Sequence, residues 1–255
     1  MQFKRIKILM LILFFLLDIF LLNWWRSGEV SQERVTDANT DIISEMKKQK
    51  IKLPKFGTSL HYSSYVAAQY GDRREMSLPA GLDVSTGATN TNTVFAKFKR
   101  DLFKKNGTGS DESVLSTYST GYQFNPVLTA NKTNRDRVYS QRVEGLPVIA
   151  DSGIMTFQYN KSGKPVGFTK RQLVNIERLR DDRATITEEE AIISLYRYNE
   201  IDSGDSLSKG YLSYDRTLTV NGYDIFLPVW AFEAYSGNEK YVLKINAFTG
   251  DNLSE

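Results

Sequence analysis

The side chains that could carry out chemistry are few and scattered along the chain. There is one histidine, His61, and no cysteine. A serine hydrolase needs a base and a nucleophile held on a sharp turn, but no Gly-x-Ser-x-Gly sequence occurs. Ser206 and Lys209 have the Ser-x-x-Lys spacing of penicillin-binding enzymes, yet they lie in a Ser/Gly/Asp-rich stretch and no Lys-Thr-Gly follows. We interpret His61 as a surface or packing residue and the Ser-x-x-Lys spacing as a chance match.

Carboxylates lie close together at two points and could support paired acid and base chemistry. Asp181 and Asp182 sit in an arginine-rich turn, where local ion pairing explains them. The run Glu188 to Glu190 opens an expected helix, where the backbone dipole favours negative charge. No phosphate-binding loop, dinucleotide fingerprint, His-x-x-x-His pair or calcium loop occurs. We therefore predict no enzyme activity, no catalytic residues, no cofactor and no metal site.

The distribution of charge along the chain argues against the class of nucleic-acid-binding proteins. The net charge of +3 comes from residues around the apolar N-terminal segment: Lys4, Arg5, Lys7 and Arg26, with Asp18 inside it. Without these five, 29 basic and 29 acidic residues remain. Since a nucleic-acid binder carries a basic excess on its folded part, no such partner is expected.

That apolar segment predicts a membrane span. From Ile8 to Leu22 every residue except Asp18 is apolar, and with its flanks the segment runs from residue 6 to 25. About 20 helical residues cover roughly 30 Å, the thickness of the hydrocarbon layer. The basic residues before it place the N-terminus in the cytoplasm. A cleaved signal peptide is the alternative, but Trp24 and Trp25 suit the outer interface and no small-x-small cleavage pattern follows them.

Asp18 is the residue of this segment that carries most information. A carboxylate in the hydrocarbon layer costs about 3 kcal/mol, so it normally faces protein or water. Leu11, Phe15, Asp18 and Leu22 follow helical spacing, and this face is a candidate contact with another membrane helix. Alternatively, Asp18 lies near enough to the outer interface to reach water.

The remainder predicts an α+β fold of antiparallel sheets packed with helices. Lys161 to Lys164 form a hairpin turn, and Thr187 with Glu190 has capping-box spacing. Leu146-Pro147-Val148 and Leu227-Pro228-Val229 suggest two related units. The expected helices cover residues 33–50, 94–105 and 187–198, and the expected strands cover residues 60–70, 154–159, 166–168, 210–219, 225–235 and 240–247.

The expected domains are a cytoplasmic tail (1–5), a transmembrane helix (6–25), and extracellular N-terminal (26–125) and C-terminal (126–255) subdomains in a single-pass protein of the cell membrane.

The two ends of the chain resemble a known family. The anchor, Lys-Ile-Lys-Ile followed by Leu-Phe-Phe-Leu-Leu-Asp18, the Ile-Lys-Leu-Pro stretch at residues 51–54, and Leu-Pro-Val-Trp through Thr-Gly at residues 227–250 are similar to the YycI (WalI) family. The closing hairpin also resembles PepSY-type domains. The YycI resemblance implies two related PepSY-like or YycH-like units. It also implies an auxiliary regulator of the WalK/WalR (YycG/YycF) two-component system that controls cell-wall metabolism. The implied partners are a WalK-like sensor histidine kinase, a YycH-like protein and the lipid bilayer.

Two other function classes stay open at this point. An extracytoplasmic binding module for a cell-envelope ligand could use some of the 14 tyrosines as a stacking groove. The third class is an inhibitor of an enzyme or of a protease, for which PepSY-type hairpins are a precedent. The regulatory class leads because the chain combines an expected anchor with no catalytic set.

Overall fold

A computed structural model describes residues 2–57, 59–87, 91–99, 111–130, 132 and 135–254 of the chain. The chain divides into two compact units, residues 1–49 and residues 50–255. Each unit is described by itself.

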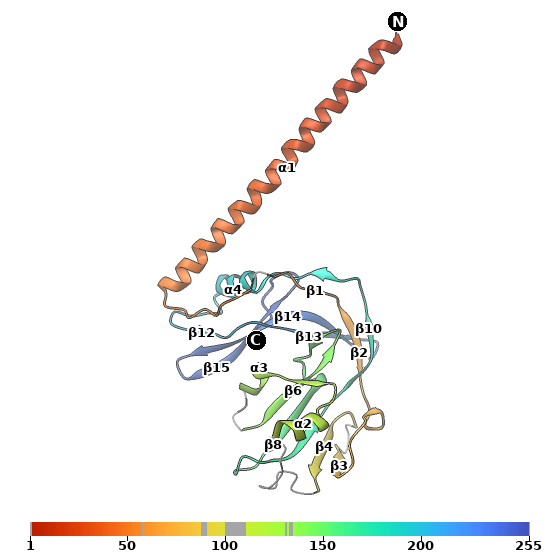
Figure 1. Cartoon of the computed structure of the whole chain (residues 1–255), viewed down its shortest axis with the longest axis vertical. Helices are drawn as coiled ribbons and strands as arrows, with labels where there is room; N and C mark the ends of the chain where they lie inside the picture. Colours follow the sequence, from red (N-terminus) through yellow and green to blue (C-terminus); the bar gives the residue numbers. More distant parts are fainter. Residues whose placement is uncertain are drawn as a thin grey trace. The chain divides into compact units, whose positions relative to one another are not determined.

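The first unit is the helix α1 (Gln2–Lys48), a single continuous element where separate helices were expected for residues 6–25 and 33–50 (Figure 1). Its last turn closes as the Gln49 amide donates to the Glu45 carbonyl at 3.0 Å. Lys50 then adopts a φ of 63°, a left-handed conformation that cannot continue a helix. The helix therefore ends at Lys48, two residues before the end expected for the helix of residues 33–50.

Along α1 the large apolar side chains from Ile6 to Leu22 are all exposed, between 46% for Ile19 and 71% for Leu11. Over the described residues, however, no helix combines the length and the apolar character that crossing a membrane requires.

The second unit contains two antiparallel sheets and a short ribbon (Figure 1). Sheet I contains β2 (Val66–Tyr70), β10 (Leu173–Arg178), β12 (Ser206–Leu207), β13 (Tyr211–Val220), β14 (Tyr223–Ser236) and β15 (Glu239–Asn246). Sheet II contains β3 (Leu82–Thr86), β4 (Val94–Phe98), β5 (Tyr122–Phe124), β6 (Arg137–Val143), β7 (Leu146–Pro147), β8 (Ile154–Tyr159) and β9 (Pro165–Lys170). The ribbon pairs β1 (Tyr62–Ser63) with β11 (Arg183–Ala184). The helical elements of this unit are α2 (Asp111–Tyr118), α3 (Pro126–Ala130), α4 (Glu188–Arg197) and the 3-10 turns η1 (Arg73–Glu75) and η2 (Asp151–Gly153).

The long strand β14 organises sheet I. One side pairs with β13 and β12, and the other with β2 and β15. Its aromatic and β-branched residues favour a strand, and both faces are buried from Phe226 to Ala234. The β13–β14 hairpin turns at Asn221-Gly222, whose φ angles of 52° and 81° match the tight turn that Asn-Gly favours. All three strands expected here, at residues 210–219, 225–235 and 240–247, are confirmed.

Sheet II has the strand order β3-β4-β9-β8-β6-β5, with β7 beside β6. The helix α2 packs on one face through Leu115 and Tyr118, over a core that includes Phe157 and Phe168. Sheets I and II are joined by the buried Gln141 of β6. Its side-chain amide accepts from the Leu173 amide at 2.7 Å and donates to the Leu173 carbonyl at 2.9 Å, as a paired strand would. The β8–β9 hairpin expected around residues 161–164 is confirmed.

The helix expected over Val94 to Lys105 is wrong at its start. Residues Val94 to Phe98 form β4, paired with β3 and β9. The buried face of this strand carries Val94 and Ala96, while Phe95 is 44% exposed, so the burial follows a period of two rather than a helical one. The rest of the expected helix, residues 100–105, lies outside the described part of the chain.

The strand expected over residues 60–70 is interrupted and forms β1 and β2. The helix expected at residues 187–198 is confirmed as α4. Thr187 and Glu190 form the expected capping box, because the Thr187 hydroxyl accepts from the Glu190 amide at 3.2 Å and the Glu190 carboxylate accepts from the Thr187 amide at 2.8 Å. An α+β fold of antiparallel sheets with few helices is thus established. The predicted boundary between residues 125 and 126 does not separate the sheets, since sheets I and II each take strands from both sides of it.

Candidate functional site

The four residues predicted to contact a membrane partner lie on α1. Leu11, Phe15, Asp18 and Leu22 are exposed, and at 3.6 residues per turn they fall within about 60° of one another around the helix axis. The helix therefore brings them onto one stripe. Their contact with a partner stays a prediction.

The one histidine and the Ser-x-x-Lys sequence have structural roles. His61 is exposed, and its ring lies edge-on to Trp230, 5.7 Å between centroids, which confirms the interpretation as a surface or packing residue. Ser206 belongs to the short strand β12 and pairs with Tyr235, so it is not at the start of a helix. Two residues on, the Ser208 hydroxyl accepts from the Glu233 amide at 2.9 Å. The interpretation of this spacing as a chance match is confirmed by its strand geometry.

Two of the carboxylates singled out in the sequence, those of Asp182 and Glu188, form contacts that stabilise the fold. Asp182 pairs with Arg178 at 3.3 Å, and Arg178 also contacts Glu144, so the expected local ion pairing is confirmed for Asp182, while that of Asp181 stays a prediction. Glu188, buried at the start of α4, accepts from the Gly57 amide at 3.0 Å and from the Gly210 amide at 2.6 Å. A carboxylate that accepts from two backbone donors holds the loops of Gly57 and Gly210 against the start of α4, which is a structural role. Across the described residues, no group of three or more His, Cys, Asp or Glu side chains could hold a metal ion.

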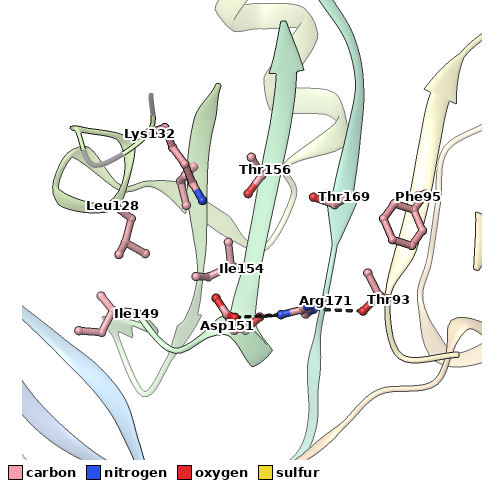
Figure 2. Close-up of a pocket in the computed structure, with 11 residues that line it drawn as sticks. Thr93, Phe95, Leu128, Lys132, Ile149, Asp151, Ile154, Thr156, Thr169 and Arg171 are labelled. Atoms are coloured by element: carbon pink, nitrogen blue, oxygen red, sulfur yellow. Dashed lines mark hydrogen bonds and ion pairs between the residues drawn. The ribbon is translucent and has the colours of Figure 1, made fainter. Parts of the chain in front are cut away.

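A groove of about 450 Å³ lies on sheet II (Figure 2). Its floor is polar in the middle, where Thr156 of β8 and Thr169 of β9 lie on neighbouring strands, and more apolar at the flanks, where Phe95 and Ile149 lie. The remaining lining residues are Thr93, Leu128, Lys132, Val138, Asp151, Ile154 and Arg171. This mixture suits a polar ligand or chain segment better than an apolar one.

Arg171 holds one end of this groove in place. Its guanidinium lies between Asp151, at 3.3 Å, and the Thr93 hydroxyl, to which Nε donates at 3.1 Å (Figure 2). Its backbone amide also donates to the Ile154 carbonyl at 2.9 Å. The arginine thus joins η2 to the start of β4. None of these residues stood out in the sequence, although outward threonines at Thr156 and Thr169 follow from the alternation of the expected hairpin.

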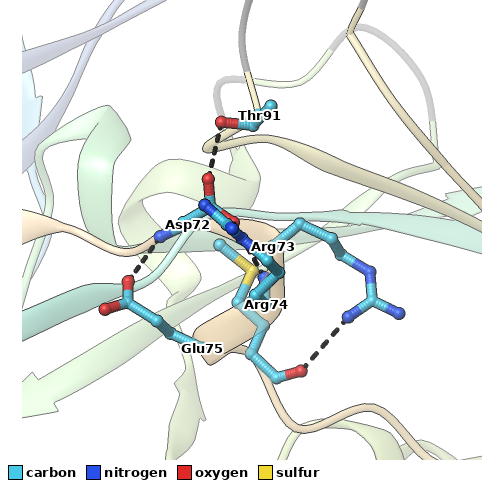
Figure 3. A network of polar contacts seen from close by, with 6 residues as sticks. Asp72, Arg73, Arg74, Glu75 and Thr91 are labelled. Carbon is cyan, nitrogen blue, oxygen red and sulfur yellow. Dashed lines mark hydrogen bonds and ion pairs between the residues drawn. The ribbon is translucent and has the colours of Figure 1, made fainter.

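A pinned turn precedes β3 (Figure 3). The Asp72 carboxylate accepts from the Arg74 amide at 3.0 Å, from the Arg74 guanidinium at 3.1 Å and from the Thr91 hydroxyl at 2.9 Å. These bonds lower the pKa of Asp72 to about 2, with the Arg74 backbone bond as the largest cause. In return, the Glu75 carboxylate accepts from the Asp72 amide at 2.6 Å, and Arg73 donates to the Met76 carbonyl at 3.5 Å. The turn therefore fixes Glu75 and the residues after it.

Comparisons with known proteins identify the family. A family model described as "YycI protein" matches residues 30–248. An uncharacterized protein from Eubacterium rectale ATCC 33656 is structurally similar at 10% identity over 81% of this chain and 91% of that chain, with a TM-score of 0.49. The C-terminal domain of Bacillus megaterium YpeB is similar at 14% identity over 85% of this chain and 94% of that chain, with a TM-score of 0.34. No curated protein matches the chain.

The family match covers much more than half of the chain and includes every strand of both sheets. It confirms the resemblance to this family that was stated from the sequence, while the expected anchor at residues 6–25 lies outside the matched residues. YycI proteins are regulatory proteins, not known as enzymes, and the family is associated with the WalK/WalR two-component system and its kinase. The chain belongs to the YycI family.

Proposed function

We propose that this protein is a membrane-anchored auxiliary regulator of a WalK-like sensor histidine kinase, acting together with a YycH-like protein. The observation that carries the proposal is family membership over residues 30–248 combined with the exposed apolar surface of α1. Fifteen large apolar side chains between Ile6 and Leu22 are exposed on this helix. Such a continuous apolar surface is stable in a bilayer and unfavourable in water.

The length of α1 gives this anchor a second property. Its 47 residues extend about 70 Å, more than twice the roughly 30 Å of a hydrocarbon layer. With residues 6–25 in the bilayer, the same helix continues beyond the outer interface without a break. A continuous helix transmits a shift or rotation better than a flexible linker does. The N-terminal tail lies in the cytoplasm and residues 50–255 lie outside the cell in this arrangement.

Within the bilayer, the stripe of Leu11, Phe15, Asp18 and Leu22 provides the contact with a partner helix. Asp18 is the only acidic residue among the apolar side chains, and a carboxylate there gains most by facing a polar group of another protein helix. The contact is expected to change the autophosphorylation rate of the kinase.

Site-specific photocrosslinking in membranes tests the stripe. A photoreactive residue at position 15 should capture the kinase or the YycH-like protein, whereas one at Leu13, about 160° around the helix from Phe15, should capture lipid. Asp18→Leu should reduce the protein adduct formed from position 15. Capture of lipid alone from both positions would remove the partner helix from the proposal, and recovery of a form that begins after Trp25 would remove the anchor.

A binding module for a cell-envelope ligand is the second candidate function, and the groove on sheet II favours it. Replacement of residues 6–25 by an unrelated membrane helix discriminates between the two. Loss of kinase contact on replacement supports the regulator. Ligand binding that survives replacement, with kinase contact unchanged, supports the module.

A further inference from the structure

Lys170, the last residue of β9, is a buried cation. The residue is only 5% exposed. Its alternation with Phe168 places it on the face of sheet II that α2 covers, between Met155 of β8 and Val94 of β4. Among the described residues, no carboxylate or other acceptor forms an ion pair or hydrogen bond with its ammonium group. The ring of Tyr122 makes a stabilising contact, with Nζ 5.1 Å from the centroid.

This arrangement is unfavourable for a lysine without a ligand. The ammonium group is not sealed from water, since Lys170 lines a pocket, but the side chain has lost most of its hydration and the face of one aromatic ring replaces only part of it. The Tyr122 hydroxyl donates to the Arg171 carbonyl at 2.5 Å, and its ring rather than its oxygen is the contact with the ammonium group. Burial accordingly lowers the pKa of Lys170 from its ordinary value.

The ammonium group borders a pocket of about 300 Å³. One wall comes from the pinned turn and the residues after it, a second from the end of α2, and a third from β9 and the residue that precedes β10. The lining residues are Glu75, Ser77, Pro79, Thr117, Tyr118, Thr120, Lys170 and Gln172. The pocket therefore places one buried cation and one exposed carboxylate among neutral hydroxyl and amide side chains.

We propose that this pocket binds the α-carboxylate of a free amino acid or short peptide. Lys170 supplies the charge-assisted hydrogen bond to the carboxylate, and hydroxyl groups such as that of Ser77 supply neutral donors. Glu75 receives the ammonium group of the same ligand. Its Oε2 accepts from the Asp72 amide, which orients the side chain and leaves Oε1 for the ligand. The pocket shares no lining residue with the groove on sheet II.

The test uses the full-length protein in detergent micelles, with binding measured by calorimetry and by NMR of reductively methylated lysines. The probes are L-alanine, L-alanyl-L-alanine, L-alanine amide and N-acetyl-L-alanine. The two carboxylate-bearing zwitterions should bind and shift the Lys170 resonance, and the amide should not. Tighter binding of the dipeptide assigns the site to peptide ends, and tighter binding of alanine assigns it to free amino acids.

Variants separate a ligand site from a structural lysine. Lys170→Met should weaken zwitterion binding at least about tenfold, as expected for loss of a charge-assisted bond. The matched control Lys97→Met, at an exposed position of β4, should bind like the wild type. Glu75→Gln keeps an acceptor for the Asp72 amide and should weaken binding of alanine but not of N-acetyl-L-alanine.

Two outcomes would overturn the proposal. One is equal binding by wild type and a Lys170→Met protein whose thermal unfolding shows it to be folded. The other is the absence of any heat or Lys170 shift with all four probes at millimolar concentration. In either case Lys170 would be a structural residue held by the Tyr122 ring.

Discussion

Two buried charges of the second unit, Glu188 and Lys170, differ in what surrounds them. Glu188 at the start of α4 is 3% exposed and accepts hydrogen bonds from two backbone amides, those of Gly57 and Gly210. Lys170 of β9 is 5% exposed and has only an aromatic ring beside its ammonium group among the described residues. The two side chains are therefore buried to a similar extent, but the carboxylate has hydrogen-bond partners and the ammonium group has none among the described residues.

The difference separates a structural charge from a candidate binding charge. Around Glu188 the backbone closes in so tightly that a Cβ added at Gly210 would lie 2.7 Å from a Phe232 ring carbon and 3.0 Å from Cγ of Glu188. Around Lys170 there is instead a pocket of about 300 Å³. A charge satisfied by close-packed backbone donors stabilises the fold, while one that borders a cavity has room for a ligand.

Removal of the Glu188 carboxylate should have the largest effect. Glu188→Ala leaves two buried backbone amides without an acceptor, so we expect a loss of about 3 kcal/mol in the free energy of unfolding. Denaturant unfolding followed by circular dichroism measures it. Glu189→Ala, in the same first turn, is the control and should cost about 0.5 kcal/mol through the helix dipole. Similar losses for both variants would show that the two amide bonds do not stabilise the loops.

The sequence predicts the contacts between residues that are close along the chain and misses those between distant residues. The capping box of Thr187 and Glu190 spans three residues, so α4 was predicted correctly from local signals. The partners of Glu188 are 131 and 22 residues away, and no local pattern indicates them. The helix dipole therefore predicted correctly that Glu188 is structural, but it accounts for only part of that role, because the two backbone donors were not foreseen.

The same reasoning accounts for the wrong helix at Val94 and for the missed lysine. Phe95 and Phe98 have helical spacing, but pairing with β3 and β9 decides the conformation, and β9 is distant in sequence. Lys170 could have been found, since Phe168 of the expected hairpin points inward and a period of two carries Lys170 to the same face. The pocket beside it could not, because its walls come from three separate segments.

Replacement of the buried lysine should have a smaller effect with the opposite sign. Lys170→Met removes an ammonium group that is costly to bury, so stability at neutral pH should stay equal or rise by up to about 1 kcal/mol. Because burial lowers the pKa of Lys170, the unfolded chain binds more protons between the lowered value and the ordinary 10.5. The wild type should therefore approach the variant in stability as pH rises through that window.

Unfolding of both proteins across the alkaline range measures how the difference in stability shrinks. For the control Lys97→Met, the difference from the wild type should not change with pH in this way. A Lys170→Met protein that is less stable than the wild type by as much as Glu188→Ala would contradict the contrast. It would mean that the ring of Tyr122 satisfies Lys170 as fully as two amides satisfy Glu188.

The smallest effect is expected at the turn that carries Glu75 to the pocket. The pKa of Asp72 is lowered to about 2 from the ordinary 3.8, so its contribution to stability is complete above pH 3.8 and is lost as pH falls through about 2. The stability gap between wild type and Asp72→Asn should close over that range, and Asp83→Asn on β3 is the control. Because the Asp72 pair with Arg74 is at the surface, the gap should be small at every pH. A gap that persists unchanged at pH 2 would show that the charge of Asp72 is not what stabilises the turn. The protonated carboxyl group would then hold the turn as well as the carboxylate does, and the pocket wall would be independent of charge at this turn.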